Sequence, residues 1–329
     1  MPTPERPDRN LALEIVRVTE AAALAAARWQ GRGEKIKGDQ AAVDAMRQML
    51  GSVEMKGRII IGEGEKDEAP MLYNGEEVGT GAPPEVDIAV DPIDGTRLLA
   101  EGRPGSLAVL AAAPAGTMFD PGPCVYMHKM VVGADAADAI DIEAPLADTL
   151  AKIAKAKDRE VSDLNVMMLD RDRHEAFKKE IREAGARLQL LTDGDVAGAV
   201  LAAWDAKDVD LLVGIGGTPE GVITACAVKA LDGRILGQLW PRNDQERSEA
   251  VNLGYDVDAV LDTDDLVTSE DCFFSCTGIT PGQLVEGVTF DGRGATTESL
   301  MMRGKSGTVR VVKARHRLTK LREYAVAAY

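Results

Sequence analysis

Apolar residues recur every three to four positions from Leu11 to Trp29, and alanine is dense among them, which predicts a helix. The same spacing at residues 39–50 predicts a second helix, with Asp39 at its N-terminal edge. A glycine-framed, charged loop is expected before it, at residues 31–38. The β-branched run at residues 58–62 then predicts a short strand, which leads into a loop rich in acidic residues.

Three further apolar runs predict strands at residues 85–91, 106–114 and 126–133. Pro92 and Gly95 are expected to end the first of these strands. Two helices followed by a cluster of strands are typical of an α+β arrangement.

The second half of the chain alternates between helical and strand patterns. Helices are predicted at residues 146–157, 173–185, 195–204 and 218–231, and strands at residues 164–170, 187–194 and 209–217. This alternation predicts α/β layering around a largely parallel sheet, with strands and turns again from about Asp271. We therefore expect two lobes, an N-terminal α+β lobe at residues 1–145 and a C-terminal α/β lobe at residues 146–329 that includes the terminal strands.

Composition and charge limit the possible partners. The chain has 329 residues, 45% of them hydrophobic, and a formal net charge of -16 without any long basic block, so nucleic acid is not an expected partner. An anionic substrate would need bound cations to reverse the local field. The longest apolar run, near residues 21–29, is too short to span a bilayer, and the polar start lacks a secretory pattern. A cytoplasmic protein without a membrane partner is expected.

Four cysteines are present: Cys124, Cys226, Cys272 and Cys276. Cys272 and Cys276 lie four apart in a predicted strand, so their side chains are expected on one face. Three histidines and no close cysteine pair make a zinc site an unfavoured interpretation. Small buried thiols are favoured, and a redox switch stays open.

The stretch "DPIDGT", residues 91–96, places two carboxylates at the end of a predicted strand. Pro92 bends the chain, so that Asp91 and Asp94 can face one point. Gly95 leaves room for a phosphate to approach, and the Thr96 hydroxyl can orient a water molecule. A solvated acidic turn is the alternative for this stretch taken alone.

Other acidic residues strengthen the functional interpretation. Asp39 is predicted at a helix start and Glu63 directly after a strand, with Asp67 four residues further on. Carboxylate oxygens are the ligands that Mg²⁺ and Mn²⁺ prefer. The sequence therefore predicts a divalent-cation site built from scattered acids.

The stretch "DPIDGT" resembles the signature of the metal-dependent, lithium-sensitive sugar and inositol phosphatases. Further segments are together similar to the class II, or GlpX-type, fructose-1,6-bisphosphatases: "GRGEKIKGDQAAVDAMR", "IIIGEGEKDEAPML", "YMHKMVVG", "DRHE", "LTDGDVAGA" and "GIGGTPEGVI". The resemblance runs from the first predicted helix nearly to the C-terminus. It implies the layered α-β-α-β-α fold of the sugar phosphatases, with two lobes.

The resemblance implies a function as well. Members hydrolyse the 1-phosphate of fructose 1,6-bisphosphate in gluconeogenesis, and some also cleave sedoheptulose 1,7-bisphosphate. It implies a two-metal site for Mn²⁺ or Mg²⁺, a sugar bisphosphate as the small-molecule partner, and a homodimer or homotetramer. The implied metal ligands are Asp39 and Glu63 at one position and Asp91, Asp94 and Glu220 at the other. Many members have Glu where this chain has Asp94, whose shorter side chain reaches less far.

The implied catalytic residues are Lys35, Asp67 and Thr96. Thr96 and Asp67 would orient and deprotonate the attacking water, while Lys35 offsets charge on the phosphoryl oxygens. Arg173 suits bidentate phosphate binding, and the glycine-rich "GIGGTPEG" precedes a helix start that favours an anion. The implied substrate contacts are Asp94, Gly95, Thr96, Tyr126, Arg173, His174, Glu175, Asp193, Gly194, Asp195 and Gly217.

Two other functions stay open. An inositol-monophosphatase-like or other sugar phosphatase would share "DPIDGT", and a non-catalytic sugar-phosphate-binding protein could use the same scaffold. Two motifs are excluded. Ser299 stands where a phosphate-binding P-loop ending in "GKS" needs glycine, and Pro219 stands where a dinucleotide fingerprint needs its third glycine.

Overall fold

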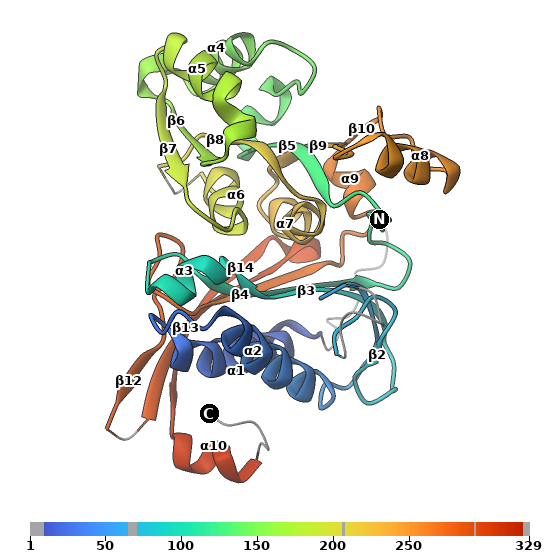
Figure 1. Cartoon of the computed structure of the whole chain (residues 1–329), viewed down its shortest axis with the longest axis vertical. Helices are drawn as coiled ribbons and strands as arrows, with labels where there is room; N and C mark the ends of the chain where they lie inside the picture. Colours follow the sequence, from blue (N-terminus) through green and yellow to red (C-terminus); the bar gives the residue numbers. More distant parts are fainter. Residues whose placement is uncertain (1–9, 65–70, 206–207, 293, 325–329) are drawn as a thin grey trace, which may run out of the picture.

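The computed structural model describes residues 10–64, 71–205, 208–292 and 294–324. Within them the chain forms two sheets with helices between and outside them (Figure 1). The helices are α1 (Ala12–Ala26), α2 (Lys35–Leu50), α3 (Thr96–Glu101), α4 (Leu146–Ala156), α5 (Glu175–Glu183), α6 (Val196–Ala203), α7 (Thr218–Ala230), α8 (Asp244–Asn252), α9 (Thr263–Leu266) and α10 (Leu318–Tyr324). Short 3-10 turns lie at Ala27–Trp29, Ala134–Ala139, Val161–Asp163, Asp172–His174 and Gly304–Ser306.

The first sheet has eight strands among the described residues, in the order β12-β13-β11-β4-β3-β1-β2, with β14 paired to β13. Its strands are β1 (Lys56–Ile61), β2 (Glu77–Val78), β3 (Glu85–Asp94), β4 (Leu107–Pro114), β11 (Phe273–Gly278), β12 (Thr289–Asp291), β13 (Gly294–Arg303) and β14 (Thr308–His316). The second sheet has six described strands, in the order β10-β9-β5-β8-β6-β7. They are β5 (Tyr126–Val132), β6 (Asn165–Leu169), β7 (Arg187–Leu191), β8 (Leu211–Gly217), β9 (Arg234–Leu239) and β10 (Val260–Leu261).

The layers follow the predicted α-β-α-β-α order. Helices α1 and α2 cover the outer face of the first sheet, α6 and α7 lie between the sheets, and α4 and α5 cover the second sheet from outside (Figure 1). Each interface has its own apolar core, with Ile15 and Met46 in the first, Val200 and Ile223 in the second, and Leu150 in the third. The predicted fold class is confirmed.

The second sheet is mixed, so the prediction of a largely parallel sheet is wrong. Strand β6 pairs in parallel with β7 and β8, but β5 is antiparallel to both β8 and β9, and β10 is antiparallel to β9. The unit β8–α7–β9 leaves one place between its two strands, and β5 fills that place. Strand β9 and helix α8 had not been predicted.

The chain moves between the sheets twice. It leaves the first sheet after β4 and enters the second at β5, then returns after β10 to add β11 to the centre of the first sheet. The lobe boundary near residue 145 stays a prediction. None of the described helices has both the length and the apolar character needed to cross a membrane.

Helix α2 begins at Lys35, four residues before the predicted start at Asp39, so the prediction of a loop over residues 31–38 is wrong in its second half. Gly38 does not break the helix because it faces close neighbours. An added Cβ there would lie 3.2 Å from Leu99 and 3.5 Å from Trp29. Lys35 and Asp39 are thereby placed one turn apart on the same helix.

Strand β3 continues through Pro92 to Asp94, although it had been predicted to end at Asp91. Its pairing with β4 shifts by one residue between Asp91 and Asp94, which is a β-bulge. Pro92 is tolerated because a bulge leaves one residue outside the ladder of hydrogen bonds.

All four cysteines are free and buried. Cys272 and Cys276 both contribute to the core between the sheets, which confirms that they share a face. The favoured interpretation as small buried thiols is confirmed.

Candidate active site

Most of the predicted site residues meet where β3 of the first sheet ends opposite the ends of β7 and β8 of the second. The cavity there has a volume of about 400 Å³, within the range of small-molecule sites. Eleven predicted site residues line it: Asp91, Asp94, Gly95, Thr96, Tyr126, Arg173, Asp193, Gly194, Asp195, Gly217 and Glu220. Two sheets and five chain segments therefore build one site.

Asp91 is held at the bulge of β3. Its Oδ1 atom accepts a hydrogen bond of 3.0 Å from the backbone N–H of Ile93, which closes a local turn around Pro92. Burial raises the pKa of Asp91 well above its ordinary value, and the nearby carboxylates of Asp94, Glu220 and Glu63 raise it further. Their mutual repulsion shows that these acids share one low-dielectric region.

Asp94 and Glu220 each carry an oxygen that is buried without a hydrogen-bond partner among the described residues. These atoms are Oδ2 of Asp94 and Oε2 of Glu220, and burial raises the pKa of both side chains. A buried carboxylate oxygen without a donor is costly unless a cation binds it. The pair therefore fits a hard divalent cation.

Asp39 and Glu63 form the second acidic group. Burial raises the pKa of Asp39, and the Thr96 hydroxyl and Lys35 oppose that rise. Desolvation raises the pKa of Glu63, and the Asp39 carboxylate adds to the effect. The Thr96 hydroxyl also donates to the carbonyl oxygen of Ile93 at 3.2 Å, so it lies close both to Asp39 and to the stretch that carries Asp91 and Asp94.

The two groups match the two predicted metal positions in composition. Within the described part of the chain, no three His, Cys, Asp or Glu side chains meet at a single point as they would around a bound ion. The fit to cations rests instead on the unpartnered oxygens, on the raised pKa values and on an all-oxygen donor set.

Glycines make space for these carboxylates. Gly217, the last residue of β8, lies against the Glu220 carboxylate, and a Cβ at this position would overlap it. Gly194 has φ 66° and lies against Asp94, with the place of an added Cβ 2.9 Å from the carboxylate oxygens. Gly95, with φ 85°, is the N-cap of α3 and turns the chain after the bulge.

Cationic side chains lie on the opposite wall. The Arg173 guanidinium stacks on Tyr126, with its Cζ 4.8 Å from the ring centroid, and donates to the carbonyl oxygen of Ile215 at 2.7 and 3.1 Å. The remaining guanidinium N–H groups fit an anionic oxygen. Arg171 lines the same cavity and had not been predicted.

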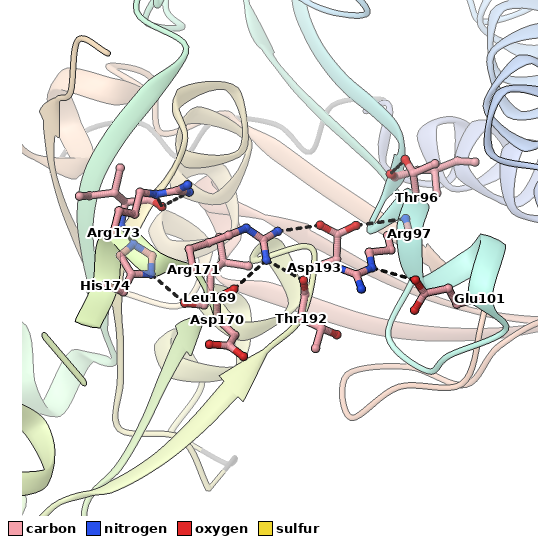
Figure 2. Close-up of polar contacts among 12 residues, drawn as sticks. Thr96, Arg97, Glu101, Leu169, Asp170, Arg171, Arg173, His174, Thr192 and Asp193 are labelled. Atoms are coloured by element: carbon pink, nitrogen blue, oxygen red, sulfur yellow. Dashed lines mark hydrogen bonds and ion pairs between the residues drawn. The ribbon is translucent and has the colours of Figure 1, made fainter. Parts of the chain in front are cut away.

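Asp193 connects the two sheets across the cavity (Figure 2). One carboxylate oxygen lies 3.0 Å from Arg171 Nη2, and the other accepts a hydrogen bond of 3.1 Å from the backbone N–H of Arg97 in α3. Arg171 also donates to the carbonyl oxygen of Thr192 at 2.7 Å. Part of the hydrogen-bonding capacity of Asp193 is thus used within the protein.

His174 and Glu175 do not line the cavity. His174 is buried: its Nε2 accepts from the backbone N–H of Ile215 at 2.7 Å, so its Nδ1 donates to the carbonyl oxygen of Leu169 at 2.7 Å (Figure 2). Glu175 is exposed and pairs with Lys178 at 2.7 Å. These two hydrogen bonds of His174 link the ends of β6 and β8 and help to position the adjacent Arg173.

The three predicted catalytic residues differ in where they lie relative to the cavity. Thr96 lines the cavity as the first residue of α3. Lys35 is exposed at the first position of α2, close enough to Asp39 to affect its pKa. Asp67 lies outside the described residues.

A second cavity, of about 450 Å³, lies at the opposite end of β3, next to Glu85. Two of its carboxylates are neutralised by ion pairs: Glu85 with Lys56 at 2.8 Å, and Asp271 with Arg303 at 2.8 Å. Because the unpartnered carboxylate oxygens of Asp94 and Glu220 lie at the other end, we place the chemistry there.

Comparisons with known proteins agree with this geometry. A sequence profile of the family described as "Bacterial fructose-1,6-bisphosphatase, glpX-encoded" matches residues 9–316. The chain belongs to this family. The fructose-1,6-bisphosphatase 1 class 2 of Escherichia coli (strain K12) is 46% identical over 325 residues, covering 95% of this chain and 96% of the relative. The class 2 enzymes of Escherichia coli O6:H1 and of Shigella flexneri match equally well.

The predicted family is thereby confirmed. It is a family of metal-dependent phosphatases whose name specifies a sugar bisphosphate as substrate. The inositol-monophosphatase-like and non-catalytic alternatives lose their support, because the match covers nearly the whole chain and not only the shared stretch at residues 91–96.

Proposed function

We propose that this fructose-1,6-bisphosphatase removes the 1-phosphate of fructose 1,6-bisphosphate with two divalent cations, Mn²⁺ or Mg²⁺. Asp39 and Glu63 would hold one cation, and Asp91, Asp94 and Glu220 the other. Two such cations stabilise the attacking and leaving oxygens of an in-line displacement at phosphorus. The unpartnered buried oxygens of Asp94 and Glu220 are the observation that carries the proposal.

The chain's own groups complete the reaction centre. The Thr96 hydroxyl lies close to Asp39 and to the turn that follows Asp91, where it can orient the attacking water toward the phosphorus. Gly95 exposes backbone at the turn before α3, so the phosphoryl group can approach closely. Lys35, one helical turn before Asp39, adds positive charge next to that carboxylate.

The far wall would hold the remainder of the substrate. Arg173, stacked on Tyr126, and the nearby Arg171 can bind the 6-phosphate, because guanidinium groups pair with two phosphate oxygens at once. The Asp195 carboxylate and the Gly217 backbone line the space between the acidic end and the arginines, where the sugar hydroxyls would lie. The proposed orientation of the substrate therefore follows from charge. The cations would bind the 1-phosphate at one end of the cavity, and the arginines would bind the 6-phosphate at the other.

A substrate panel tests this proposal. We expect Mn²⁺-dependent conversion of fructose 1,6-bisphosphate to fructose 6-phosphate, identified by NMR, with kcat/KM at least about a hundredfold above that for inositol monophosphate. Fructose 6-phosphate should not be hydrolysed further. A preference for inositol monophosphate, or full turnover in excess chelator, would overturn the assignment.

Three finer points remain predictions. Cleavage of sedoheptulose 1,7-bisphosphate is tested by the same panel. A homodimer or homotetramer is tested by light scattering on the purified protein. A cytoplasmic location is tested by fractionating cells that produce the chain.

A further inference from the structure

Lys129 lies in the middle of β5, and its side chain is only 1% exposed. It belongs to the stretch "YMHKMVVG", to whose lysine neither the sequence interpretation nor the proposed function gives a role. Lysine is almost never fully buried unless its charge is paired. A fully buried lysine next to a reaction centre therefore requires a physical explanation.

The ammonium of Lys129 contacts two groups of the cavity wall. Its Nζ lies 2.9 Å from Oδ2 of Asp195 and donates to the carbonyl oxygen of Gly217 at 3.2 Å. The Asp195 side chain is itself only 6% exposed. Both partners line the cavity.

The surrounding backbone is shaped to admit this contact. Gly216 in β8 faces the ion pair, and a Cβ there would lie 3.0 Å from Cε of Lys129 and would overlap the Asp195 carboxylate. Strands β5 and β8 are paired at this point, with Lys129 opposite Gly214. The ammonium is thus held from two sides, with little freedom to move.

Lys129 also compensates charge. Asp94 and Glu220 lie close enough that its positive charge opposes the rise in their pKa values, while Asp195 adds to that rise. Its direct contacts, however, are to Asp195 and Gly217, on the side of the cavity where the sugar would bind.

We propose that Lys129 is a positioning residue for the substrate: it fixes the Asp195 carboxylate and the Gly217 carbonyl where they accept hydrogen bonds from sugar hydroxyls. This inference rests on the proposed function. Without the ammonium, Asp195 would be a buried carboxylate without its charged partner and would turn away from its present position. Sugar binding would weaken, whereas recognition of a bare phosphate at the metal end would not.

The test compares Lys129→Met, Asp195→Asn and the double variant, with formation of fructose 6-phosphate followed at saturating Mn²⁺. We expect Lys129→Met to raise KM for fructose 1,6-bisphosphate about tenfold or more, with a smaller change in kcat. The inhibition constant of inorganic phosphate, which lacks a sugar, should stay within about threefold of the wild-type value.

The double variant tests whether Lys129 acts through Asp195. If it does, Lys129→Met adds less than about threefold to KM in the Asp195→Asn background, because the group that it positions is already altered. The double variant removes both charges of the ion pair, so it leaves no unpaired buried charge and stays informative even if either single variant folds poorly. If the increases in KM caused by the two single substitutions multiply in the double variant, the proposal is overturned.

Lys229→Met is the matched control. Lys229 is a lysine of similar burial that pairs with Asp264 at 2.9 Å and Glu270 at 3.2 Å, away from the cavity. The Lys229→Met substitution should lower the midpoint of thermal unfolding and leave KM for fructose 1,6-bisphosphate unchanged. Equal loss of sugar and phosphate recognition in Lys129→Met, as in general destabilisation, would contradict a positioning role. Absence of turnover in the wild-type protein would instead refute the proposed function.

Discussion

The pKa values of five carboxyl groups are raised at the end of β3, and burial or mutual repulsion is the cause in each case. They belong to Asp39, Glu63, Asp91, Asp94 and Glu220. Such a cluster of buried carboxylates lowers the stability of the folded chain at neutral pH unless a cation binds among them. At the residue scale, the site is therefore a group of acidic side chains that favours divalent cations, in the same cavity as two arginines that suit a phosphate group.

Arg173 provides the first prediction at this scale. Arg173→Lys keeps the charge but removes the planar fork and the stacking on Tyr126. We expect KM for fructose 1,6-bisphosphate to rise about tenfold while kcat changes little, measured by initial rates of phosphate release. Arg187→Lys, in an exposed arginine of β7, is the control and should behave as wild type. An unchanged KM in Arg173→Lys would show that Arg173 does not bind substrate.

His128 provides a prediction about pH. Burial lowers its pKa from 6.5 to about 4, with the nearby His174 contributing, and its ring stacks on Phe177 at 5.2 Å. The unfolded chain binds a proton at His128 below pH 6.5, whereas the folded chain does not do so until about pH 4. The free energy of unfolding should therefore fall as pH decreases through this window, by up to about 3 kcal/mol from this group.

The measurement is urea unfolding at pH 7 and pH 4.5 for the wild type and His128→Gln, followed by tryptophan fluorescence. His128→Gln cannot titrate, so its free energy of unfolding should decrease less between these pH values. Identical decreases in the two proteins would contradict a neutral buried imidazole.

At the element scale, short interruptions of regular structure place the functional groups. The bulge in β3 turns Asp91 and Asp94 toward one region, and the β8–α7 junction brings Glu220 to the same region. The glycine at the end of β8 allows this close approach. Without the bulge and the junction, these side chains would point in different directions and would not share one region.

Gly217→Ala tests the β8–α7 junction. An added methyl group would overlap the Glu220 carboxylate and push it from its position. We expect about a tenfold to hundredfold lower kcat and a higher Mn²⁺ concentration for half-maximal activity. Gly292→Ala is the control, since an added Cβ there has no described atom within 4 Å, and it should keep wild-type activity. Full activity in Gly217→Ala would exclude the proposed role of this junction.

Much of the element order was predictable because apolar spacing differs clearly between helices and strands. The start of α2 was missed because Gly38 suggested a loop, whereas it is a packing position against Leu99. Strand direction in the second sheet was missed because β5 comes from a distant part of the chain. Local pattern does not determine which strands become neighbours.

The site was predictable where one motif carries the chemistry, as at residues 91–96. It was less predictable in "DRDRHE", where alternate side chains of a turn face different directions. The sequence interpretation selected Arg173 with His174 and Glu175, yet the structure places Arg171 and Arg173 in the cavity and His174 in the core. Orientation at a turn depends on tertiary contacts, here the bonds from His174 to Leu169 and Ile215.

For the whole molecule, the proposed site depends on both sheets being held together. The acids come mainly from the first sheet and the arginines from the second, and Asp193 connects them through Arg97 and Arg171. The net charge of -16 would repel a bisphosphate, so local cations are needed for binding. In the proposed mechanism, divalent cations would therefore serve both substrate capture and the chemical step.

The most direct test of this account is the number of Mn²⁺ ions bound per chain, measured by isothermal titration calorimetry. We predict two for the wild type and for the control Asp148→Asn, whose side chain lies on α4 in the outer helical layer. We predict one each for Asp39→Asn and Asp91→Asn, because each removes a ligand from a different acidic group. Two ions retained in both variants, or none bound by the wild type, would contradict the central claim.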